Sequence, residues 1–175
     1  AGGIQKCQND DEFELKYPQV LGLTIKGEKA RAILLEKMAD IKKELYLSLF
    51  LNRSKRCYTI IASPEGGVEI ESVKNQIIKE VGLGNVSEQV AREVAKEMKL
   101  EGKAADDFVD ILQKLAKLTI EKEAELAEIN PLAIMQDGSL MALDGKFVTD
   151  DNGNFRHDEL QKYQEKTEIE ERAEK

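Results

Sequence analysis

The segment 124–147, AELAEINPLAIMQDGSLMALDGKF, limits the possible folds more than any other part of the sequence. Two runs of strand-forming residues flank Asp137-Gly138, a dipeptide typical of β-hairpin turns. Because successive side chains of a strand point to opposite faces, the length of the turn decides which residues share a face. A register can be judged by where it puts the polar residues of the two runs: Glu128, Asn130, Asp144 and Lys146.

A two-residue loop at Asp137-Gly138 would place Asn130 and Asp144 on opposite faces. A three-residue loop, Gln136-Asp137-Gly138, with Gly138 in the left-handed bulge position, pairs Asn130 with Asp144 and Glu128 with Lys146. All four polar groups then share one face. The other face would collect an apolar set for packing on helices: Ile129, Pro131, Ala133, Met141, Leu143, Gly145 and Phe147. Because a slip of one residue would bury carboxylates and expose Phe147, the sequence predicts the three-residue loop.

This pairing places an amide oxygen beside a carboxylate. Both are hard oxygen ligands, and Mg²⁺ typically takes one or two such groups together with substrate phosphates and water. The pattern therefore favours a site for a metal–nucleotide complex at Asn130 and Asp144. The alternative is an ordinary exposed strand face with a cross-strand pair between Glu128 and Lys146, and the pattern alone does not decide between the two.

The rest of the chain predicts an α+β domain with an antiparallel sheet. We expect strands at 31–38, 44–51 and 57–63, and a short strand within 64–71 that follows a Pro/Gly turn. We interpret Gly66-Gly67 as a turn that needs a positive φ, with close approach to a phosphate as the alternative. Helices are expected at 87–98, capped by Ser87, and at 104–121, where an apolar stripe would pack on the sheet.

Composition limits the class of protein. The formal net charge of −8 argues against an extended nucleic-acid interface, which needs clustered Lys and Arg. No apolar run approaches the 18 residues or so of a membrane span. Cys7 and Cys57 do not form a Cys-x-x-Cys pair, so we expect a reducing compartment. His157 lies in a polar loop, where we expect it to be exposed and inert.

Several segments together resemble the β subunit of succinyl-CoA synthetase, within its ATP-grasp domain. They are "AGGIQ", "DIKKELYLSLFLNRSKR", "ASPEGGVEIE", "AEINPLAIMQDGSLMALDGK" and "DDNGNFRHDEL". The resemblance implies the C-terminal half of an ATP-grasp domain, with an antiparallel sheet and helices on one face. It divides the chain into residues 1–30 (the end of the N-terminal subdomain and its glycine-rich loop), 31–157 (the nucleotide and metal subdomain) and 158–175 (a charged linker helix).

The resemblance also implies roles for single residues. Asn130 and Asp144 would hold the Mg²⁺ of ATP or GTP, and Glu128 would face the phosphohistidine of a partner α subunit. The positions that match contacts to adenine and ribose are Glu36, Ala39 and Glu44. The implied reaction joins succinate to CoA with cleavage of a nucleoside triphosphate, in the cytoplasm of a prokaryote or in a mitochondrial matrix. The family's phosphate-gripping Lys and its CoA domain are absent from this sequence, so we expect the fragment alone to be inactive. A malate–CoA ligase and a non-catalytic ATP-grasp-like interaction module are the alternatives.

Overall fold

The computed structural model describes residues 2–25, 27–68, 70–161 and 163. The chain divides into two compact units, residues 1–40 and 41–175, and each is described by itself. The first unit contains helix α1 (Asp10–Leu21) and a hairpin of β1 (Thr24–Ile25) and β2 (Glu28–Lys29). Asn9 caps α1 because its side chain accepts a hydrogen bond from the backbone N–H of Glu12 at 2.9 Å.

The predicted strand at 31–38 is wrong, because residues 30–40 form no regular secondary structure. Its apolar side chains remain in solvent: Leu34 is 80% exposed, Leu35 is 70% exposed and Met38 is 61% exposed. A strand is stable only when a neighbouring strand satisfies its backbone groups, and none of the described strands pairs with this segment. Strand-forming composition alone was therefore insufficient to predict a strand in this segment.

The second unit is built on a six-stranded antiparallel sheet. Its strands are β3 (Ile41–Asn52), β4 (Cys57–Ser63), β5 (Ile77–Val81), β6 (Ala124–Met135), β7 (Leu140–Ala142) and β8 (Gly145–Thr149). They are ordered β5-β4-β3-β6-β7, with β8 also paired to β6. Thus β3 and β6 lie at the centre, paired with each other. The predicted antiparallel sheet of an α+β fold is confirmed.

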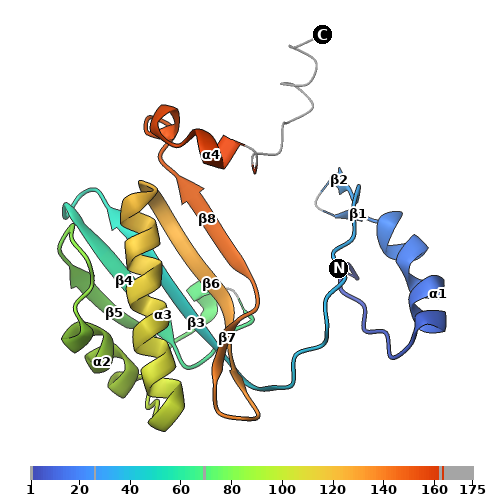
Figure 1. Ribbon diagram of the computed structural model, residues 1–175, viewed down its shortest axis with the longest axis horizontal. Helices are drawn as coiled ribbons and strands as arrows, with labels where there is room; N and C mark the ends of the chain where they lie inside the picture. The colour runs from blue at the N-terminus through green and yellow to red at the C-terminus, as the bar shows by residue number, and fades with distance from the viewer. Residues whose placement is uncertain (1, 26, 69, 162, 164–175) are drawn as a thin grey trace. The chain divides into compact units, whose positions relative to one another are not determined.

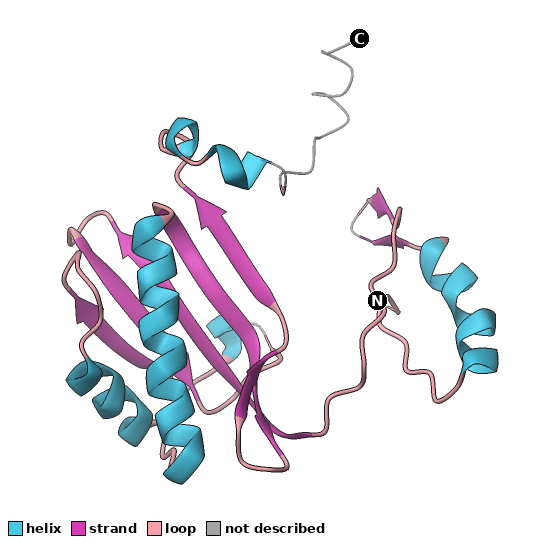
Figure 2. Ribbon diagram, viewed as in Figure 1, coloured by secondary structure: helices cyan, strands magenta, loops and turns pink. Residues whose placement is uncertain are grey.

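Helices α2 (Glu88–Glu97) and α3 (Gly102–Glu121) lie side by side on one face of this sheet (Figure 1 and Figure 2). Ser87 caps α2 as predicted, because its hydroxyl accepts a hydrogen bond from the N–H of Val90. Along α3 the side chains of Phe108 and Leu112 are fully buried, and they belong to the same core cluster as the fully buried Leu47 of β3. The helix stripe and one face of the central strands therefore form a single core.

The segment 64–81 differs from the prediction. The expected strand within 64–71 is wrong: residues Ile70–Ser72 form a short 3-10 helix, η1. The edge strand is instead β5, which the sequence analysis did not identify, and its Ile77 and Val81 pack against the core.

Downstream of β8 lie a second 3-10 helix, η2 (Asn154–Arg156), and α4 (Asp158–Gln161). Most of the predicted linker helix at 158–175 lies outside the described residues, and the three predicted domain limits stay predictions.

Candidate functional site

The hairpin of β6 with β7 and β8 has the predicted register. The backbone N–H of Asn130 donates to the carbonyl of Asp144 at 3.1 Å, and Glu128 lies opposite Lys146. The turn is closed by a bond from the Met135 N–H to the Ser139 carbonyl, and Gly138 has a φ of +79°. The three-residue loop with a left-handed glycine is therefore confirmed. Asn130 and Asp144 therefore lie opposite each other in the hairpin.

The predicted apolar face of this hairpin is only partly correct. Leu47 of β3 pairs with Ile129, but Leu45 pairs with Leu132, so β6 has one extra residue at this point. Such a bulge changes which residues face the core: Ile129 and Leu132 both belong to it. The alternation expected through Pro131 and Ala133 is lost. On the other strands of the hairpin, Met141 is 47% exposed and Phe147 is 38% exposed instead of buried.

The bulge places Asn130 beside the loop that follows β4. Its Oδ1 accepts a hydrogen bond from the backbone N–H of Gly67 at 2.8 Å, and its Nδ2 donates to the carbonyl of Val68 at 3.1 Å. These two partners settle the orientation of the amide, because only one assignment of oxygen and nitrogen satisfies both. Gly67 has a φ of +70°, as predicted for the turn at Gly66-Gly67. The sequence analysis did not foresee the contact, because residues 67 and 130 are far apart in the chain.

Asp144 is exposed, and its Oδ1 accepts a hydrogen bond from the N–H of Gly145 at 2.8 Å. A carboxylate has about four acceptor positions and an amide oxygen has two, so Asp144 and Asn130 both retain acceptor capacity. This fits Mg²⁺, which favours oxygen ligands. Within the described residues, no three His, Cys, Asp or Glu side chains gather into a metal site.

Glu128 has a different environment from Asp144. It pairs with Ser48 on the central strand β3. Its Oε2 accepts a hydrogen bond of 2.6 Å from the hydroxyl of Tyr46, a side chain only 3% exposed. A short bond from a buried hydroxyl holds one carboxylate oxygen in place and leaves the other for a further contact. The sequence analysis did not identify Tyr46, because a tyrosine is a common strand-forming residue and this one lies within an apolar run.

The residues expected to contact the nucleotide fall in different units. Glu36 is exposed and Ala39 is half-buried in the first unit, whereas Glu44 lies on β3 in the second. The carboxylate of Glu44 lies against Gly67, since a Cβ added there would meet Glu44 Oε2 at 2.0 Å. Glu44 thus lies on β3, Glu128 and Asn130 lie on the adjacent strand β6, and Asp144 lies between β7 and β8. The roles of all six residues remain predictions.

His157 is not the exposed residue that we expected. Its side chain is 13% exposed, and Nε2 lies 3.1 Å from Glu123 Oε2. Arg156 donates two hydrogen bonds to the same carboxylate, at 2.8 and 2.9 Å. The bonds from Arg156 lower the pKa of Glu123, and His157 adds a smaller effect in the same direction. This cluster connects the segment after β8 to the turn between α3 and β6.

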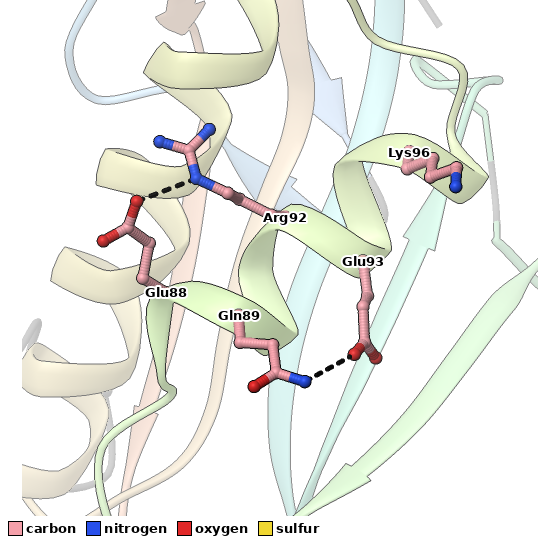
Figure 3. Close-up of a pocket in the computed structure, with 5 residues that line it drawn as sticks. All are labelled: Glu88, Gln89, Arg92, Glu93 and Lys96. Atoms are coloured by element: carbon pink, nitrogen blue, oxygen red, sulfur yellow. Dashed lines mark hydrogen bonds and ion pairs between the residues drawn. The ribbon is translucent and has the colours of Figure 1, made fainter.

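A shallow depression on the solvent side of α2 has the character of a solvated helix face (Figure 3). Arg92 donates to Glu88 at 2.8 Å and Gln89 donates to Glu93 at 3.3 Å, so these lining side chains satisfy one another. Ligand pockets are usually concave and lined mainly by hydrophobic and aromatic side chains, whereas only charged and polar residues line this open depression. No helix among the described residues is long and apolar enough to cross a membrane.

Comparison with known proteins gives consistent results. The model of the ATP-grasp domain family matches residues 1–134. The chain is 41% identical over 168 residues to the succinate–CoA ligase [ADP-forming] subunit beta of Chloroflexus aggregans, covering 91% of this chain and 44% of that protein. It is 38% identical over 176 residues to the same subunit of Bacteroides fragilis, covering 97% and 46%. The chain therefore spans less than half the length of these curated relatives.

Solved structures share the fold at low sequence identity. The apo form of a dinucleotide-forming acetyl-coenzyme A synthetase 1 of Ca. Korarchaeum cryptofilum matches with a TM-score of 0.64 and 19% identity, over 82% of this chain and 69% of that one. An ATP citrate lyase from Methanothrix soehngenii, in complex with citrate and coenzyme A, matches with a TM-score of 0.69 and 18% identity, over 90% and 37%.

Proposed function

Because this chain belongs to the ATP-grasp domain family, we propose that it is the nucleotide-binding and metal-binding part of a succinate–CoA ligase β subunit. The similarity to the β subunits of Chloroflexus and Bacteroides supports the choice of ligase. The observation that carries the proposal is the pairing of Asn130 with Asp144 in the β6 hairpin. It brings together two residues that carry the oxygen ligands favoured by Mg²⁺, opposite each other in the hairpin.

In this proposal Asn130 and Asp144 bind the Mg²⁺ of ATP or GTP. A bound Mg²⁺ would neutralise charge on the phosphate oxygens. The protein's own contribution to phosphoryl transfer is mainly positioning and electrostatics. Glu36, Ala39 and Glu44 would contribute the contacts to the adenine and the ribose.

Glu128 is proposed to face the phosphohistidine of an α subunit. A fixed carboxylate can accept an N–H hydrogen bond from the imidazole, orienting the ring and stabilising positive charge on it. The hydrogen bond from Tyr46 supports this role, because it fixes the carboxylate before any partner arrives. In the full enzyme, the phosphoryl group would pass from nucleotide to histidine and then to succinate, and CoA would displace it.

Calorimetric titration of the whole chain with ATP tests the proposal, once with excess Mg²⁺ and once with EDTA. We expect binding that weakens at least tenfold without the metal. The Asp144→Ala variant should lose this metal dependence, whereas Asp110→Ala should keep it, because Asp110 is an exposed carboxylate on α3 paired with Lys114. Equal affinity with and without metal would refute the metal site. Absence of binding at millimolar ATP would favour a non-catalytic module.

A further inference from the structure

The loop after β4 lies so close to β3 that a side chain cannot fit at its centre. The N–H of Gly66 donates to the carbonyl of Glu44 at 3.1 Å. A Cβ added at Gly66 would lie 2.1 Å from the carbonyl oxygen of Leu45 and 2.7 Å from its backbone nitrogen. These are backbone atoms that cannot move aside, so glycine is required for this approach.

The next two residues of the loop contact two proposed ligand residues. Gly67 and Val68 present one donor and one acceptor to the amide of Asn130, at 2.8 and 3.1 Å. Gly67 also lies against the carboxylate of Glu44. An aspartate at position 130 could accept from Gly67, but it could not donate to Val68. The contacts therefore explain why the residue is an amide rather than a carboxylate.

We propose that Gly66-Gly67-Val68, here called the positioning loop, orients the Asn130 amide for the metal and the Glu44 carboxylate for the nucleotide. The inference rests on the proposed function and assigns the loop a role in it. With one lone pair of Oδ1 accepting the Gly67 N–H, the other is left for a ligand, and the bond to Val68 keeps the amide from flipping. Outer hydrogen-bond partners of this kind hold ligands in the geometry that a metal requires.

The first test needs no metal. In the Gly67→Ala variant the left-handed φ is unfavourable, and the new methyl group displaces Glu44. We expect the side-chain NH₂ signals of Asn130 to shift in NMR spectra, and the backbone amide of residue 67 to exchange with solvent at least tenfold faster. Gly84→Ala is the matched control, because it has open space for a Cβ and lacks a positive φ. It should leave both signals unchanged.

The second test measures metal binding, with Mn²⁺ as the probe in the presence of ATP. Loss of one net hydrogen bond that orients the ligand corresponds to about a tenfold rise in the dissociation constant. We expect that rise in Gly67→Ala and no change in Gly84→Ala. A variant that folds, keeps the wild-type Asn130 signals and binds Mn²⁺ as tightly as the wild type would overturn the inference.

Asn130→Asp supplies an independent variant should Gly67→Ala fail to fold. If residue 130 acts only as an oxygen ligand, the added charge should keep or strengthen Mn²⁺ binding. The positioning loop predicts the opposite: amide exchange at Gly67 accelerates and Mn²⁺ binding weakens at least fivefold, because the bond to Val68 is lost. Tighter binding in Asn130→Asp would overturn the inference. Failure of the wild type to bind Mn²⁺ with ATP would instead overturn the proposed function, and the metal role of the loop with it.

Discussion

The bond between Tyr46 and Glu128 allows a quantitative test of how firmly the proposed catalytic carboxylate is held. The Tyr46→Phe substitution removes one hydroxyl from a side chain that is 3% exposed and leaves the ring in place. Hydrogen bonds to charged groups contribute about 1.5–3 kcal/mol. Glu128 is half-buried, so water can replace part of the lost bond, and we expect the lower value, about 1.5 kcal/mol.

The measurement is urea unfolding followed through the amide NMR signals of β3, since these report on the second unit alone. The wild type, Tyr46→Phe, Glu128→Ala and the double variant form a thermodynamic cycle, and the coupling free energy should be about 1.5 kcal/mol. Tyr58→Phe is the control. Tyr58 is 8% exposed on the adjacent strand, and its hydroxyl has no hydrogen-bond partner among the described residues. That variant should change the free energy of unfolding by less than about 0.5 kcal/mol.

A coupling free energy below about 0.5 kcal/mol would refute this reasoning, as would equal effects of the two tyrosine variants. Either result would mean that Glu128 is held by its strand alone. The proposed role opposite a phosphohistidine would then lack the prepositioned carboxylate on which it depends.

Three further predictions concern the frame around the site. Phe108→Ala should lower the free energy of unfolding by about 3–5 kcal/mol in urea, because the ring is fully buried; a loss under about 1 kcal/mol would contradict its place in the core. Ser87→Ala should cost about 1 kcal/mol through loss of the α2 cap, whereas Ser87→Gly should cost only a few tenths. The pKa of Glu123 is lowered by Arg156, so its stabilising contribution is present above the ordinary value of 4.5 and is lost as the pH falls through the lowered pKa. The protection of the Arg156 Nε–H, relative to its intrinsic exchange rate at each pH, should therefore be lost only below pH 4.5, and a loss that begins near neutrality would contradict the assignment.

Local chemistry determined a substantial part of this structure. The left-handed glycine at 138 and the alternation around it were enough to predict the hairpin register and the pairing of Asn130 with Asp144. The apolar stripe of α3 and the Ser87 cap of α2 could also be predicted from the sequence, because both depend on residues within a few positions of one another.

Tertiary structure decided the features that depend on contacts between distant segments. The bulge in β6 is defined against β3, and it ended the alternation that the sequence had predicted beyond Ile129. The amide of Asn130 is oriented by a loop more than 60 residues away in the chain. The segment 31–38 has strand-forming residues but no described partner strand, so its backbone forms no ladder. In each case the deciding term is a hydrogen bond to a remote backbone group, which periodicity in one segment cannot encode.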